Sequence, residues 1–145
     1  MPPTKKNLKR ELAVLYLDAN VFIFAALNTE EDGDKAVILL KKIQQGEEQA
    51  ITSALTFDEV LWEVKRNRGI EKALETAEAM LNFPNLKIIP TDREVARSAI
   101  QIIKECNLAP RDAIHAATAI AEKVDFIVST DAHFDRVKEL KRKKL

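Results

Sequence analysis

An unbroken apolar run from Ala13 to Leu17 stops at a carboxylate, Asp18, and a second apolar run resumes at Val21. A run of this length and continuity is typical of a strand that is buried on both faces, as in a parallel sheet. In open parallel sheets, ligand sites lie outside the carboxyl ends of the strands. Asp18 would stand at such an end, where it either lines a site or simply caps the helix that follows.

Short apolar segments alternate with helical patterns along the rest of the chain. This alternation predicts an α/β sandwich built around a parallel sheet and flanked by helices. The chain shows no internal repeat, so we expect one domain over residues 11–145. We expect strands at 11–17, 49–53, 86–89 and 125–128, and helices at 19–27, 33–45, 56–67, 70–82, 91–106, 110–122 and from 131 onward.

The composition suits one globular domain, with 145 residues of which 46% are hydrophobic. The longest apolar runs are interrupted by polar side chains, so none is expected to span a bilayer. The N-terminus lacks the apolar core of a signal peptide. A single cysteine, Cys106, excludes an internal disulfide and suits a reducing compartment, and its apolar surroundings indicate a buried structural thiol. We therefore expect a cytoplasmic protein.

Positive charge gathers at the two ends of the chain although the net charge is zero. Residues 1–10 carry four basic side chains and no acidic one, and residues 136–145 carry six basic side chains and one acidic one. The body between them is therefore acidic. This pattern would suit a protein that binds a cation at its centre and a polyanion at its rim. It is also a common solubility pattern, and residues 1–10 are interpreted as a basic, disordered arm.

Glu59 and Asp112 are acids within largely apolar helices. Glu59 is either part of a site or the last residue of a capping box that begins at Thr56. Asp112, His115 and Thr118 are spaced by three on a helix that is otherwise apolar, so they lie near one face and need partners inside the protein. Asp112 alone is also explained by its place in the first turn, where the helix dipole favours an anion.

Asp131 follows the fourth expected strand as Asp18 follows the first. If the segment is helical, Asp131 and Asp135 are neighbours one turn apart, which is repulsive unless a cation is near. Capping of this helix by Thr130 or Asp131 is the alternative explanation. Four acids in these positions are better explained by a shared cation. The absence of a cysteine cluster or a histidine pair favours Mg²⁺ or Mn²⁺ over zinc, with His115 and His133 packed or solvated.

These residues resemble the motifs of the PIN-domain ribonucleases, which include the VapC-type toxins of prokaryotic toxin–antitoxin pairs. The motifs occur in the family's order and cover roughly residues 12–136. They are Leu17-Asp18-Ala19-Asn20-Val21-Phe22, then Thr52-Ser53 followed by Glu59, then Pro110-Arg111-Asp112-Ala113-Ile114-His115-Ala116-Ala117, and Ser129-Thr130-Asp131-x-x-Phe134.

The resemblance implies a sheet in strand order 3-2-1-4-5 and an acidic pocket formed by Asp18, Glu59, Asp112 and Asp131. In the family this pocket holds one or two Mg²⁺ or Mn²⁺ ions, and a metal-activated water attacks an RNA phosphodiester. Family members commonly form homodimers and are silenced by a small antitoxin protein. We therefore expect an endoribonuclease toxin with RNA, an antitoxin and a second copy of itself as partners.

Three further expectations accompany the resemblance. Asn20 or Thr130 would orient a carboxylate or a water, and Asp135 is an auxiliary candidate. The basic segment after residue 137 has few apolar residues, so the family's fifth strand is expected to be short or absent. The competing hypothesis is a PIN-like module that binds RNA or protein with little or no cleavage.

Overall fold

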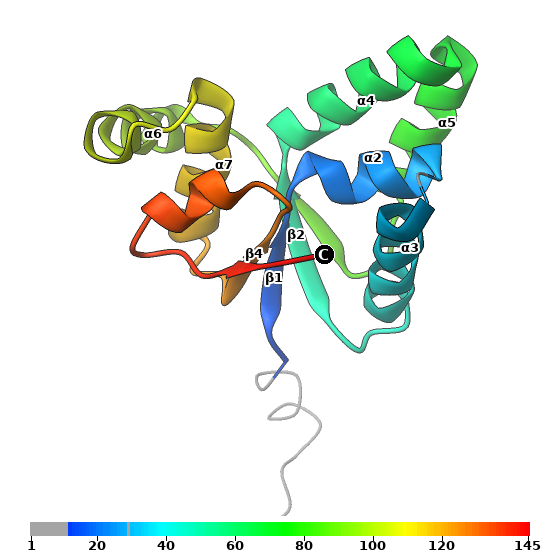
Figure 1. Ribbon diagram of the computed structural model, residues 1–145, viewed down its shortest axis with the longest axis horizontal. Helices are drawn as coiled ribbons and strands as arrows, with labels where there is room; N and C mark the ends of the chain where they lie inside the picture. The colour runs from blue at the N-terminus through cyan, green and yellow to red at the C-terminus, as the bar shows by residue number, and fades with distance from the viewer. Residues whose placement is uncertain (1–11, 29) are drawn as a thin grey trace, which may run out of the picture.

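Five parallel strands form one sheet in the order β3-β2-β1-β4-β5 in the computed structural model, which describes residues 12–28 and 30–145 (Figure 1). The order agrees with the expectation, and the fifth strand is indeed very short. The basic arm expected at residues 1–10 lies outside the described residues. The strands are β1 (Val14–Leu17), β2 (Gln49–Ser53), β3 (Leu86–Ile89), β4 (Phe126–Val128) and β5 (Arg142–Lys143).

The central strand β1 is buried on both faces, as its apolar sequence predicts. Tyr16 faces a cluster of buried apolar side chains from α6 and α7, whereas Leu15 and Leu17 face a second cluster from α2 to α5. In register, Leu17 pairs with Val128 of β4. Because β1 and β4 are parallel neighbours, the residues that follow them, Asp18 and Ser129, emerge side by side at one edge of the sheet.

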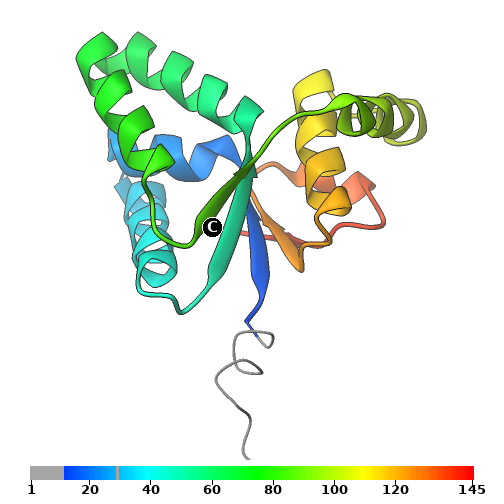
Figure 2. The same cartoon turned by 180° about the vertical axis from the view of Figure 1, so that it is seen from behind.

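The helices form two layers on opposite faces of the sheet (Figures 1 and 2). The helices α4 and α5 form a hairpin that rises beyond the carboxyl edge of the strands. None of the helices in the described residues has the length and apolar character needed to cross a membrane. One layer holds α2 (Ala19–Leu27), α3 (Glu30–Gln44), α4 (Ala54–Arg68) and α5 (Ile70–Leu81), and the other holds α6 (Arg93–Cys106), α7 (Pro110–Ala121) and the 3₁₀ helix η1 (Ala132–Arg136).

Helix α3 begins at Glu30, three residues before its expected start, and the starts of α4 and α6 differ because other residues act as caps. Helix α4 begins at Ala54, and its N-cap is Ser53, whose hydroxyl accepts a hydrogen bond from the backbone N–H of Thr56 at 3.3 Å. The capping box proposed for Thr56 and Glu59 was therefore wrong. Helix α6 is capped by Asp92 and begins at Arg93, two residues after the expected start. An acid at Glu59 is thus not explained by helix capping.

The segment after Asp131 also differs, because it forms a five-residue 3₁₀ helix and not an α-helix. A 3₁₀ helix has three residues per turn, so side chains four apart no longer share a face. The expected proximity of Asp131 and Asp135 is lost for this reason.

Gly33 lies in the first turns of α3, where that helix passes close to the end of α2. A Cβ atom at this position would lie 3.1 Å from the backbone carbon of Asn28 and 3.1 Å from the carbonyl oxygen of Phe24. These atoms belong to the backbone and cannot rotate away. The close approach of α3 to α2 therefore depends on glycine at this position.

We expect Gly33→Ala to lower the free energy of unfolding by about 1–3 kcal/mol, because the added methyl group overpacks a backbone contact. Alanine would otherwise favour the helix by up to roughly 1 kcal/mol over glycine. Urea denaturation of the variant measures the sign. Asp34→Ala, an exposed substitution on the same helix, is the matched control and should change stability by less than about 0.5 kcal/mol. A stabilised Gly33→Ala protein would contradict the close packing of α3 against the end of α2.

Candidate active site

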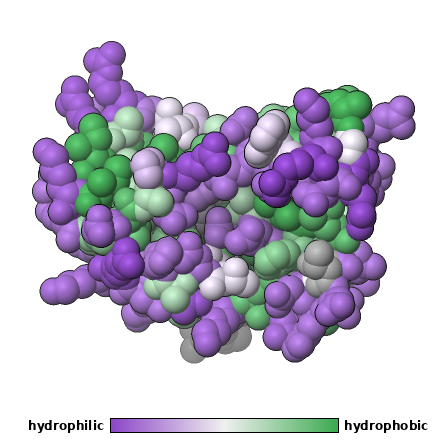
Figure 3. All heavy atoms as spheres, turned by 45° about the horizontal axis from the view of Figure 1, so that its top comes forward, coloured by the Kyte–Doolittle hydropathy of each residue, from purple (hydrophilic) through white to green (hydrophobic). Residues whose placement is uncertain are grey.

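Acidic side chains from four separate segments gather at the carboxyl edge of β1 and β4. Asp18 is the N-cap of α2, and Asp131 is the N-cap of η1. Glu59 lies in the second turn of α4, and Asp112 lies in the first turn of α7. When the carboxyl edge of the strands is turned toward the viewer, hydrophilic side chains surround a central hollow between two more apolar flanks (Figure 3). The structure thus brings the four predicted acids to one edge of the sheet, and their role in a site stays a prediction.

Asp18 is the most buried of the four carboxylates, with 6% of its surface exposed. Its Oδ1 accepts a hydrogen bond from the backbone N–H of Ala19 at 2.7 Å, and its Oδ2 accepts one from the hydroxyl of Ser129 at 2.7 Å. Burial nevertheless raises the pKa of Asp18 above its ordinary value, although His115 and these hydrogen bonds oppose the rise. Asp18 therefore caps the helix, as one of its two explanations expected, while its role in a site stays a prediction.

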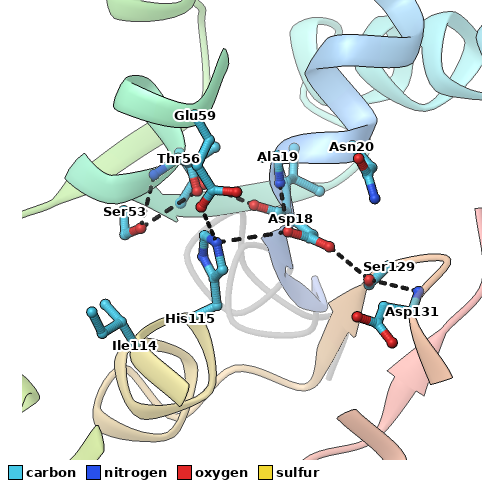
Figure 4. Close-up of polar contacts among 12 residues, drawn as sticks. Asp18, Ala19, Asn20, Ser53, Thr56, Glu59, Ile114, His115, Ser129 and Asp131 are labelled. Carbon is cyan, nitrogen blue, oxygen red and sulfur yellow. Dashed lines mark hydrogen bonds and ion pairs between the residues drawn. The ribbon is translucent and has the colours of Figure 1, made fainter. Parts of the chain in front are cut away.

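Ser129 connects Asp18 to Asp131 (Figure 4). Its hydroxyl donates to Asp18 and accepts a hydrogen bond from the backbone N–H of Asp131 at 3.0 Å. This orienting role was expected of Asn20 or Thr130. Those two side chains lie 3.5 Å from each other, between Asn20 Nδ2 and Thr130 Oγ1, while Ser129 holds the carboxylate. An effect of Asn20 or Thr130 on the site stays a prediction.

A buried histidine joins Glu59 to the core of the protein. His115 Nε2 lies 2.6 Å from Glu59 Oε1 and 3.8 Å from Asp18 Oδ1, and His115 Nδ1 lies 2.6 Å from the hydroxyl of Tyr16. Burial alone would lower the pKa of His115, but the hydrogen bond to Glu59 and the charges of Asp18, Glu59 and Asp112 raise it overall. Sequence reasoning treated this histidine as packed or solvated and missed Tyr16 altogether.

Asp112, Asp131 and His133 each place one potential ligand atom within 4.8 Å of the others. Burial, together with repulsion from Asp131 and Asp18, raises the pKa of Asp112 to about 6. Two carboxylates and an imidazole are a donor set that divalent cations such as Mn²⁺ accept, and carboxylates suit Mg²⁺. The residues present therefore fit a divalent cation, which would relieve the repulsion between these acids. His133 had not been expected among the candidate ligands.

Asp135 is directed elsewhere. Its two carboxylate oxygens accept hydrogen bonds from Arg142 at 2.9 and 3.0 Å, and this contact holds the pKa of Asp135 below its ordinary value. Arg142 also donates to the backbone carbonyl of Ser129 at 3.2 Å. Asp135 thus fastens η1 to β5 and supports the segment that carries Asp131, while its auxiliary role in the site itself stays a prediction.

We expect Asp112→Asn to stabilise the metal-free protein at neutral pH. A carboxyl whose pKa is 3.8 when unfolded and about 6 when folded loses stabilisation as the pH rises between those values. With allowance for solvent screening of this half-exposed group, the ionised carboxylate costs on the order of 1–2 kcal/mol above this window. The amide carries no charge and avoids that cost.

Urea denaturation in EDTA at several pH values measures this difference between Asp112→Asn and the wild type. The gap should widen from pH 4 to about pH 6 and then stay constant. Asp58→Asn removes an exposed acid from α4 and should produce no comparable pH-dependent gain. A variant that is less stable than the wild type at neutral pH would show that Asp112 is needed for the fold.

The chain is similar in sequence and in fold to known proteins. "Ribonuclease VapC2" of Methanocaldococcus jannaschii is 25% identical over 144 residues, which span 91% of this chain and 94% of the relative. Among solved structures, the sarcin–ricin-loop-cleaving toxin VapC20 of Mycobacterium tuberculosis superposes with a TM-score of 0.72 at 12% identity, over 86% of this chain and 95% of that one. DNA-bound VapBC of Salmonella typhimurium gives 0.69 at 19% identity, over 92% and 98%. The PIN domain matches residues 15–140, and the chain therefore belongs to the PIN-domain family.

Proposed function

We propose that this protein is a Mg²⁺- or Mn²⁺-dependent endoribonuclease that hydrolyses RNA phosphodiester bonds. The observation that carries the proposal is the cluster of Asp112, Asp131 and His133 beside the buried carboxylate of Asp18. A fold does not bring like charges together at a partly buried edge without cost, so a bound cation is the simplest reason for keeping them. The similarity to a ribonuclease along 91% of this chain supports the same reaction.

Each acid has a proposed task in binding the cation or in handling the water. Asp112, Asp131 and Asp18 supply carboxylate oxygens for one or two ions, and His133 is within reach as a nitrogen ligand. When bound, the cation offsets negative charge on the phosphate and lowers the pKa of the attacking water. Oε1 of Glu59 is engaged by His115, so Oε2 is the oxygen that remains to face the ion or accept a proton from the water.

The charge distribution supports a polyanionic substrate. Arg142 and Lys143 form β5, which pairs with β4, the strand whose end leads to Asp131, and Lys144 follows them. Arg142 is paired with Asp135 and Lys143 lies over the ring of Phe126, so they add positive charge to this edge of the sheet without contacting the acids proposed for the site. Such residues attract phosphates over distances of about 10 Å at moderate ionic strength. RNA would then run along these side chains while one phosphate enters the carboxylate cluster.

We further propose that the nuclease is the toxin of a type II toxin–antitoxin pair in the cytoplasm. The solved structures that it resembles include DNA-bound VapBC and a toxin–antitoxin complex from Klebsiella pneumoniae. A cognate antitoxin and a second copy of this chain are accordingly its proposed protein partners. The single cysteine suits the reducing cytoplasm.

Incubation of a mixed RNA pool with the purified protein tests the activity. We expect cleavage with Mn²⁺ or Mg²⁺, no cleavage with EDTA, and a loss of at least about a hundredfold in Asp112→Asn because a cation ligand is missing. The matched control Asp58→Asn removes an acid from the surface of α4 and should cut like the wild type. Cleavage that survives in Asp112→Asn would identify a contaminating nuclease.

Thermal unfolding with and without Mn²⁺ separates the nuclease from a PIN-like binding module. A ligand of the native state raises the melting temperature by mass action, so the wild type should gain stability with Mn²⁺ and Asp112→Asn should gain less. A wild type that neither cuts the pool nor responds to Mn²⁺ would contradict the proposal and favour the binding module.

A further inference from the structure

We propose that His115 is a positioning residue for this reaction, which holds the carboxylate of Glu59 at the mouth of the site and is itself held from below by Tyr16. The proposal rests on the proposed nuclease function, because the position of Glu59 matters only if Glu59 serves the cation or the water. It assigns a role to a tyrosine in β1 and a histidine in α7, neither of which is one of the four acids.

The contact geometry singles out this chain of side chains. Tyr16 is 0% exposed and His115 is 1% exposed, whereas the side chain of Glu59 is 20% exposed. The two hydrogen bonds, between the hydroxyl of Tyr16 and His115 Nδ1 and between His115 Nε2 and Glu59 Oε1, are both 2.6 Å long. The chain therefore runs from the buried centre of the sheet to the half-buried carboxylate of Glu59.

The direction of one hydrogen bond follows from its partners. A carboxylate can only accept, so Nε2 of the imidazole carries a proton and donates it to Glu59. The hydroxyl of Tyr16 donates to Nδ1 of a neutral ring and accepts from Nδ1 of a protonated one, and in either case the contact holds the plane of the ring. The two rings also meet edge to face, with centroids 5.7 Å apart and planes at 67°. His115 has little freedom to turn, and it transmits this constraint to Glu59.

Packing alone would not require these polar groups. Thr118 lies one turn further along the same buried face of α7, and its hydroxyl bonds to the carbonyl of Ile114 within its own helix at 2.8 Å. His115 instead reaches across to α4, in the other helical layer, as Figure 4 shows. Without this contact Glu59 would be free to sample other rotamers in solvent, because it extends from a helix that rises beyond the sheet.

Residues that orient the ligands of a metal typically change metal affinity or activity by roughly 10- to 100-fold when they are removed. We therefore expect His115→Ala to lower both kcat and the affinity for Mn²⁺, measured by calorimetric titration, by a factor in that range. KM for RNA should change little, because His115 is buried and does not reach the substrate. His115→Gln can still donate from its amide nitrogen to Glu59, so it should recover part of the loss.

Two more variants separate positioning from stability. Tyr16→Phe removes only the hydroxyl below the histidine and should reduce Mn²⁺ affinity and kcat less than His115→Ala. Thr118→Val removes a buried hydroxyl from the same face of α7 and should leave both quantities unchanged. Urea denaturation in EDTA measures the stability of every variant, so that losses of Mn²⁺ affinity and of kcat can be compared at known fractions of folded protein.

A double-mutant cycle with Glu59→Gln completes the test. If His115 acts through Glu59, then His115→Ala should have little further effect on Mn²⁺ affinity or kcat in the Glu59→Gln background. Additive losses, or His115→Ala binding Mn²⁺ and cleaving like Thr118→Val, would overturn the proposal. A wild type that binds Mn²⁺ but cleaves no RNA would refute the nuclease function alone, since the cycle in Mn²⁺ affinity would still decide the role of His115.

Discussion

The burial of the Asp18 carboxylate is the constraint on which the surroundings of the site depend. A carboxylate in this position is costly unless hydrogen bonds and charges replace the water it loses. Three groups supply them: the N-terminus of α2 through the N–H of Ala19, the hydroxyl of Ser129, and the nearby imidazole of His115. Because these groups come from α2, the end of β4 and α7, holding Asp18 in place also fixes how these three segments meet.

The other acids at this edge of the sheet are not stabilised in the same way as Asp18. Asp112 experiences Asp131 and Asp18 as like charges, and its pKa rises for that reason as well as for its burial. A protein optimised only for stability would replace such an acid by a neutral side chain. Retaining it is the kind of local conflict that is usually found at functional sites, where the energetic cost is offset when a ligand binds.

Much of the fold could be predicted from the sequence because it follows from local patterns. The strands 49–53 and 86–89 and the helix Ala19–Leu27 have the expected bounds, since apolar runs and turn residues determine them. The helix starts at Ala54 and Arg93 were each missed by two residues because more than one nearby side chain could act as the cap. The strand order came from the resemblance to a family and not from the pattern of residues.

The position of the four acids at one edge of the sheet could be predicted from the sequence, whereas the groups that contact them could not. Tyr16 and His115 are 99 positions apart, so no local spacing reveals their contact. The sequence analysis named Thr130 and not Ser129 as a residue that orients a carboxylate. Which of the two points toward Asp18 depends on the register between β1 and β4, and this register places Ser129 beside Asp18. Asp135 was assigned by an α-helical spacing that the 3₁₀ geometry of η1 does not follow.

The polar stripe on α7 shows why a histidine of this kind is easily misread. Three polar residues spaced by three on a buried helix all needed partners, and each found a different one. Asp112 sits at the mouth among other acids, His115 spans two layers, and Thr118 bonds within its own helix. A buried histidine is usually interpreted either as a packed core residue or as a metal ligand. A third role is possible, in which the buried ring is held rigid by the core and orients a carboxylate at the edge of the site.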